Sequence, residues 1–158
     1  MLTGQPYVEL DELFWGPEWT PKPKDEFVTR VQRAASQGSW IIEGNYGAVR
    51  EILWPRATAV VWLNYPLPTV FLRGLRRTVR RCATGEELWH GNRESARRSF
   101  LSKESILVWI LKTHRRRNHL FASLRRDNVY PQLEWIELRR PGDAERYLSE
   151  LDAGSPSK

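Results

Sequence analysis

Two short runs of consecutive apolar residues mark the first half of the chain. Trp40-Ile41-Ile42 lies within a predicted strand over Ser39–Glu43, and a second predicted strand covers Thr58–Leu63. Unbroken apolar runs of this length are typical of parallel strands that are covered on both faces. Two further strands are predicted over Tyr7–Leu10 and Glu134–Leu138.

Between these strands, apolar residues recur three and four positions apart, which is the helical period. Helices are predicted over Lys24–Gln37, Gly47–Leu53, Pro66–Arg81, Glu94–Leu101, Lys103–Arg125 and Asp143–Leu151. The segment Phe14–Pro23 is rich in Pro and Gly, so we expect an ordered loop there. The alternation of strands and helices predicts an α/β protein with an open, mostly parallel sheet. We expect a single domain over residues 1–151 and a disordered tail over 152–158.

The charge of the chain is unevenly distributed. Its net charge is +6, but the stretch from Arg73 to Arg126 alone contains 15 Lys/Arg and 4 Asp/Glu. A basic middle segment favours an anionic partner such as nucleic acid, a membrane surface or a polyphosphate. The single cysteine, Cys82, excludes a disulfide framework. No apolar run reaches the roughly 20 residues of a membrane span, so we expect a cytoplasmic protein with no membrane partner.

Polar residues follow the predicted strands, where open parallel sheets bind their ligands. Asp11 follows the first strand, Glu43-Gly44-Asn45 the second and Asn64 the third. Asp11 could hold Mg²⁺ through water or orient a substrate hydroxyl, or it could only cap the next turn. Glu43 could serve a ligand site that Gly44 lets the backbone approach, or it could only end the strand. Tyr46 and Asn45 could offer a ring and an amide to a substrate.

Three clusters of arginines follow. Arginines 73, 76, 77, 80 and 81 recur at helical spacing, and two further groups are Arg93, Arg97 and Arg98, and Arg115–Arg117. Like charges at this spacing repel one another, so the clusters favour an anionic partner over a merely solvated basic face. Arginine neutralises transferring phosphoryl groups well. His90, His114 and His119 have no metal-like spacing; the last two are five residues apart, which does not predict one helix face, and we assign them no role.

Several segments together resemble one family. They are Val8–Trp19, Trp40-Ile41-Ile42-Glu43-Gly44-Asn45-Tyr46-Gly47, Ala59–Pro66, Thr84–Ser95, Ser105–Trp109 and Thr113-His114-Arg115. This pattern is similar to that of small bacterial P-loop kinase-like proteins, described as adenylate kinase-like or DNA topology modulation proteins. The similarity covers roughly Leu2 to Leu151.

The resemblance implies a P-loop NTPase fold of the nucleoside-monophosphate-kinase type, with a parallel sheet and a helical lid at about residues 82–101. It implies an ATP-dependent kinase that acts on a nucleotide or another small acceptor with Mg²⁺. Asp11 would then lie near the acceptor, Glu43 near Mg²⁺, and Trp15, Asn45 and Tyr46 around the substrate. The resemblance makes Arg73, Arg77, Arg93, Arg97 and Arg98 the arginines that close over the phosphates.

The sequence departs from that family in one respect: it contains no G-x-x-x-x-G-K-[ST] loop, the segment whose amides and lysine hold the ATP phosphates. The resemblance implies that the first strand, this loop and part of the first helix are missing. Either a start codon is placed too late, which we favour because the other site residues are present, or the chain is a truncated relative. We expect impaired ATP binding, and self-association through strands 40–43 and 58–63, which would lack their shared neighbour.

Two alternatives to a kinase remain open. The first is a non-catalytic nucleic-acid-binding relative that uses the basic Arg73–Arg126 stretch. Against it, the sequence contains no recognisable nucleic-acid-binding motif, and Trp109 is expected in the core. The second is a decayed gene product that folds only partly or only with a partner.

Overall fold

The computed structural model describes residues 4–95 and 105–154, and its elements are mixed α and β as predicted. The strands are β1 (Tyr7–Glu9), β2 (Ile41–Glu43), β3 (Ala59–Leu63) and β4 (Glu134–Leu138). The helices are α1 (Leu10–Phe14), α2 (Lys24–Ala35), α3 (Gly47–Leu53), α4 (Leu67–Thr84), α6 (Ile106–Arg126) and α7 (Pro141–Gly154), with 3₁₀ turns η1 (Pro17–Trp19) and η2 (Trp89–Gly91). None of the described helices is long and apolar enough to cross a membrane.

The described chain divides into two compact units. Unit 1 contains residues 4–57 and 85–93, and unit 2 contains residues 58–84, 94–95 and 105–154. The chain therefore leaves unit 1 after α3, forms β3 and α4, and returns to unit 1 for η2. The single domain expected over residues 1–151 stays a prediction.

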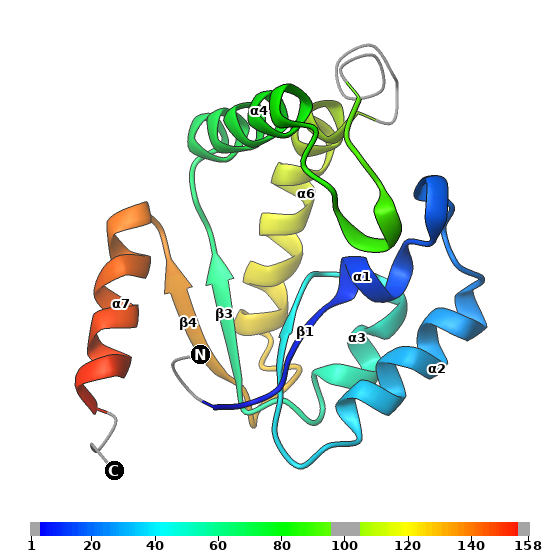
Figure 1. Cartoon of the computed structure of the whole chain (residues 1–158). Coiled ribbons are helices and arrows are strands. Elements are labelled where there is room, and N and C mark those ends of the chain that lie inside the picture. The colour runs from blue at the N-terminus through cyan, green and yellow to red at the C-terminus, as the bar shows by residue number, and fades with distance from the viewer. Residues whose placement is uncertain (1–3, 96–104, 155–158) are drawn as a thin grey trace. The chain divides into compact units, whose positions relative to one another are not determined.

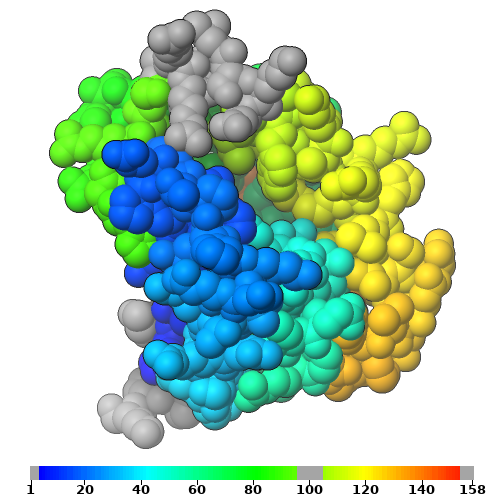
Figure 2. Space-filling model, turned by 90° about the vertical axis from the view of Figure 1, so that its right-hand side faces the viewer, coloured from blue at the N-terminus to red at the C-terminus, as the bar shows by residue number. Residues whose placement is uncertain are grey.

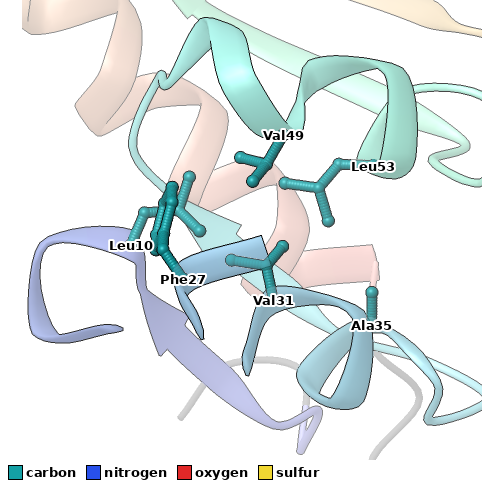
Figure 3. Packing of buried hydrophobic residues seen from close by; sticks show 6 residues of the cluster. All are labelled: Leu10, Phe27, Val31, Ala35, Val49 and Leu53. Atoms are coloured by element: carbon teal, nitrogen blue, oxygen red, sulfur yellow. The ribbon is translucent and has the colours of Figure 1, made fainter. Parts of the chain in front are cut away.

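Unit 1 is a two-stranded parallel sheet with helices packed around one apolar core. β1 pairs with β2 in the register Tyr7↔Ile41, Val8↔Ile42 and Glu9↔Glu43. Figure 3 shows the core side chains of α1, α2 and α3 pointing toward one another: Leu10, Phe27, Val31, Ala35, Val49 and Leu53. In α2 the buried positions are four residues apart, which places them on one face. The charged residues of α2 are exposed, and the helix lies at the surface in Figure 2, where it is mid-blue.

Unit 2 is built on a second parallel pair. β3 pairs with β4 over its full length, from Ala59↔Glu134 to Leu63↔Leu138. α6 lies along β3 and α7 along β4 (Figure 1). The Trp62 ring packs edge-on against Phe121 of α6 and Trp135 of β4, with ring centres 5.7 and 6.3 Å apart. These rings bury one face of the sheet.

α4 packs on α6 through a glycine. A Cβ at Gly74 would lie 2.8 Å from Cδ1 of Ile110, so only glycine allows this close approach without a shift. The buried residues of α4 are Gly74 and Thr78, while Val79 is 51% exposed.

The sheet differs from the expected one. The described strands form two separate parallel pairs, β1–β2 and β3–β4, in place of one open sheet. The strands are parallel as predicted, but the unbroken apolar runs are not covered on both faces. Ile41, Val61 and Leu63 are 39%, 48% and 54% exposed.

The ends of some elements also differ from those predicted. Asp11 lies in the first turn of helix α1, because the chain turns helical at Leu10 directly after a three-residue strand. The loop Phe14–Pro23 contains the 3₁₀ turn η1. Helix α7 continues to Gly154, so the predicted tail is helical over its first three residues. The helix predicted over Glu94–Leu101 lies mostly outside the described residues.

Candidate functional site

A carboxylate and a phenol meet where β1 and β2 end. Asp11 follows β1 in α1, and Tyr46 follows β2 as the residue that precedes α3. The Tyr46 hydroxyl donates a hydrogen bond of 2.5 Å to Oδ1 of Asp11. Burial, then this bond and the charge of Asp11, raises the pKa of Tyr46 above its ordinary value of 10.0. The Tyr46 hydroxyl therefore keeps its proton at neutral pH, and its hydrogen bond fixes the orientation of the Asp11 carboxylate.

Aromatic rings surround this pair. The Phe14 ring lies 4.7 Å from Tyr46, 5.3 Å from Phe27 and 4.9 Å from Trp15, measured between ring centres. Trp15 in turn meets Trp19 edge-on at 5.8 Å. Phe27 is fully buried, whereas Trp15 and Trp19 are not. The rings that are not fully buried form a surface on which a planar substrate could stack.

Two further carboxylates lie side by side on the β1–β2 sheet. Glu9 and Glu43 are register partners. The Tyr7 hydroxyl donates to Glu43, and the indole N–H of Trp89 donates to Glu9 at 3.1 Å. Burial and the bond to Glu43 raise the pKa of Tyr7. Sequence reasoning missed Glu9, because it precedes the end of the strand at which we looked for ligands.

These carboxylates do not by themselves form a metal site. The part of the chain that the structure describes contains no group of three or more His, Cys, Asp or Glu residues that could hold a metal ion. Asp11 and Glu43 each accept a bond from a different tyrosine. Mg²⁺ at Asp11 or Glu43 would need most of its oxygen ligands from substrate phosphates and water, so Mg²⁺ and ATP stay predictions.

The turn after β2 has a structural explanation. Gly44 has a φ of +122°, and a Cβ there would lie 2.8 Å from the Cβ of Leu10. The backbone conformation and the contact with Leu10 are enough to require glycine, without the ligand approach that the sequence suggested. The side-chain oxygen of Asn45 accepts a hydrogen bond from Arg50 at 3.1 Å. This bond connects the Asn45 side chain to Arg50 of α3.

Asn92 holds two strained turns together. It is 4% exposed and bonds three groups of unit 1: the amide of Trp19 at 2.9 Å, and the carbonyls of Gly16 and Trp89 at 2.8 Å each. Each turn contains non-glycine residues with positive φ, namely Glu18 and Trp19 in one and His90 in the other. Strained backbone of this kind persists only where the surroundings enforce it, and it clusters at functional sites. The sequence pointed to Asn92 only as part of the family resemblance.

The predicted phosphate-binding arginines lie in different places. Arg93 belongs to unit 1, where its guanidinium pairs with Glu87 at 3.4 Å and its carbonyl accepts the indole N–H of Trp19 at 3.1 Å. Arg73 and Arg77 are exposed on α4 in unit 2, and the Arg73 guanidinium lies 5.8 Å from the Tyr65 ring. Arg97 and Arg98 lie outside the described residues, as does the last part of the predicted lid, residues 96–101.

Asn64 is bound within unit 2. Its side-chain amide donates to Glu137 at 2.7 Å, and its backbone amide donates to the carbonyl of Leu138 at 2.9 Å. Arg125 and Arg139 also bond Glu137, at 3.0 and 2.9 Å. Asn64 is thus part of a polar network at the carboxyl end of the β3–β4 sheet.

Comparisons of this chain with protein-family models, with curated proteins and with solved structures find no match.

Proposed function

We propose that this chain is an ATP-dependent phosphotransferase of the adenylate kinase-like P-loop type. Its acceptor, a nucleotide or another small molecule, binds in unit 1 where β1 and β2 end. The observation that carries the proposal is the bond between Tyr46 and Asp11 beside a partly exposed aromatic surface. A fixed carboxylate next to stacking rings suits an acceptor that has both a planar ring and a hydroxyl or phosphate.

In this proposal each residue of the site has its own role. Asp11 orients the attacking group of the acceptor and accepts its proton. Trp15 supplies a face for the ring of the acceptor, and Tyr46 keeps the carboxylate in place. Arg93, which also belongs to unit 1, neutralises phosphate charge. Because the sequence contains no loop that holds a triphosphate, we expect acceptor binding to persist and transfer from ATP to be weak.

The strand pairing supports the proposed fold. The resemblance implies a further strand bound to both β2 and β3. Among the described strands, β2 pairs only with β1, and β3 pairs only with β4. One edge of β2 and one edge of β3 therefore pair with no described strand. Both pairs are parallel, as this fold requires.

Acceptor binding tests the proposal directly. The indole N–H signals of Trp15 and Trp19 are followed by NMR while nucleosides, nucleoside monophosphates and small polyols are added to the full chain. One class should shift the Trp15 signal to saturation, and Asp11→Asn should weaken that binding by about tenfold, the loss of one charge-assisted hydrogen bond. Asp25→Asn, an exposed carboxylate of α2, is the matched control and should bind normally.

A second readout addresses the reaction. The acceptor identified in this way is incubated with Mg-ATP, and its phosphorylated product is measured. Any product should disappear in Asp11→Asn and persist in Asp25→Asn. If no acceptor class shifts the Trp15 signal at millimolar concentration, the proposal is wrong.

One observation favours nucleic-acid binding as a second candidate. Trp109 was expected in the core, but it is 46% exposed, with the Arg117 guanidinium 5.3 Å from its ring. Burial lowers the pKa of the Arg117 guanidinium. An exposed indole next to a guanidinium on a basic helix is the kind of surface on which a nucleic-acid base stacks.

The second candidate predicts binding to mixed-sequence single-stranded DNA that weakens steeply as salt rises. Fluorescence anisotropy of a labelled oligonucleotide measures it. Trp109→Ala should weaken binding by about tenfold, the value of one stacked base, whereas Leu111→Ala, which removes an exposed apolar residue of the same helix, should not. Binding that is absent at low ionic strength, or equal in the two variants, excludes this role for Trp109.

A further inference from the structure

Unit 2 contains a hollow of about 530 Å³ beside the carboxyl end of β3. Its polar and aromatic lining consists of Trp62, Asn64, His114, Arg115, Asn118 and His119. This volume is within the range of small-molecule sites, which are about 300–1,000 Å³. The hollow is separate from the Asp11 site, since all these residues belong to unit 2.

α6 supplies four of these residues from adjacent turns. His114 and Asn118 are four residues apart, as are Arg115 and His119, so the two rows lie next to each other along the helix. His114 and His119 are five residues apart, so they belong to different rows of the helix. The hollow is wide enough to span both rows, and both histidines line it.

His114 is held in place by the backbone. Its Nε2 lies 2.9 Å from the carbonyl oxygen of Tyr65, which can only accept, so Nε2 carries the proton. This bond leaves Nδ1 as the ring nitrogen that can bond a ligand. The wall behind is rigid, because Trp62 is only 7% exposed and packs against Phe121 and Trp135.

The charge around the hollow is positive. Among the described residues no carboxylate lines it, and α6 carries no acidic residue. The basic residues of α6 are Lys112, Arg115, Arg116, Arg117, Arg125 and Arg126. Glu137 accepts a hydrogen bond from the lining residue Asn64 and also pairs with Arg125 and Arg139. The bond to Arg139 is the main reason why the pKa of Glu137 is lowered, and the two guanidinium groups offset its charge.

We infer that this hollow binds the phosphate group of a small phosphate monoester. The guanidinium of Arg115, the amide of Asn118 and the imidazole of His119 can donate to several oxygens of one tetrahedral dianion. A free phosphate would fill only part of the volume, and the remainder, against Trp62, accommodates the organic part of an ester. The inference does not depend on the proposed kinase function.

The side chains of the three histidines allow a direct test. Their imidazole signals are followed by NMR while inorganic phosphate, ribose 5-phosphate, adenosine monophosphate or acetate is added to the full chain. The His114 and His119 signals should shift to saturation with the phosphates, and at least one monoester should bind more tightly than inorganic phosphate. The His90 signal, from unit 1, is the internal reference for that titration.

Two neighbouring arginines provide a matched pair of variants. Arg115→Gln should weaken phosphate binding by about tenfold, since one charge-assisted contact is lost. Arg116→Gln removes the same charge from the next residue, which is exposed and does not line the hollow, and should change binding by less than about twofold. Asn118→Asp places a carboxylate in the lining and should abolish binding. The thermal melt of each variant verifies that it folds.

Any one of four results would overturn the inference. Equal losses in Arg115→Gln and Arg116→Gln would mean that phosphate responds only to the general charge of α6. Acetate binding as tightly as phosphate would exclude a phosphate site. Absence of a saturable shift at His114 and His119 with every phosphate would exclude a site altogether. A monoester that instead shifts only the Trp15 signal would support the unit 1 acceptor site and contradict this inference.

Discussion

Asn92 shows how one buried amide can organise a loop region. Its side chain satisfies a donor and two acceptors on two turns that are more than 70 residues apart in the chain. A residue that can both donate and accept is needed here, because the groups it bonds are an amide N–H and two carbonyl oxygens. The position of Trp19, and with it the aromatic surface near Asp11, depends on this side chain.

Replacing Asn92 with alanine should therefore be costly. We expect Asn92→Ala to lower the free energy of unfolding by about 3 kcal/mol, because three hydrogen bonds are lost and their partners stay buried or partly buried. Asn45→Ala, which removes the single bond of an exposed asparagine to Arg50, should cost less than about 1 kcal/mol. Urea unfolding measures both, and equal losses in the two variants would contradict the role assigned to Asn92.

The bond between Tyr46 and Asp11 predicts an alkaline effect. The pKa of Tyr46 is raised in the folded chain, so the stability that its hydroxyl contributes is fully present below about pH 10, the pKa of an unfolded tyrosine, and is lost as the pH rises above that value. Tyr46→Phe should cost about 1 kcal/mol at pH 7, and this difference should shrink above about pH 10. Unfolding in urea from pH 7 to 11 measures it, and a constant difference would contradict the prediction.

At the scale of elements, the sequence predicted most of the secondary structure, because apolar periodicity and glycine or proline breaks are local signals. It could not predict what depends on packing. The first strand is only three residues long, so Asp11 falls in the first turn of a helix. The helical period of α6 did not show that Trp109 faces outward. Of the candidate site, Asp11 and Tyr46 were predicted, whereas Asn92 and the histidines of α6 were not, since their partners are distant in sequence.

The contact between α4 and α6 provides a test at this scale. We expect Gly74→Leu to lower the free energy of unfolding by about 2–3 kcal/mol, because a larger side chain overlaps Ile110 and overpacks the interface. Gly47→Leu, at the first residue of α3 where a Cβ meets nothing within 4 Å, should be nearly neutral. Urea unfolding compares them. If Gly74→Leu leaves the free energy of unfolding unchanged, the close contact between α4 and α6 does not contribute to stability.

For the whole molecule, the two units have opposite charge. The described residues of unit 1 carry seven Lys/Arg and ten Asp/Glu, and those of unit 2 carry fourteen and eight. The anion-binding chemistry proposed here accordingly lies mainly in unit 2, and the carboxylate chemistry in unit 1. Each unit also contains an apolar strand that is only partly covered.

The exposed apolar face of β3 leads us to expect that the chain self-associates. Ala59, Val61 and Leu63 share one face of the sheet, and Val61 and Leu63 are about half exposed. The double variant Val61→Thr/Leu63→Thr keeps residues suited to a strand but removes most of the apolar surface. Sedimentation velocity should show a mass that rises with concentration for the unmodified chain and a monomer for the variant. Leu72→Gln/Leu111→Gln, which changes equally exposed helical residues, should still associate.

The return of residues 85–93 to unit 1 has a consequence for the order of folding during synthesis. Asn92 leaves the ribosome only after β3 and α4 have been translated, so the turns it joins cannot be locked while unit 1 is the only part of the chain outside the exit tunnel. β3 must in turn wait for β4, which emerges much later. The nascent chain therefore carries an unfinished unit 1 and an unpaired β3 at the same time, and this interval is when a chaperone would be needed most.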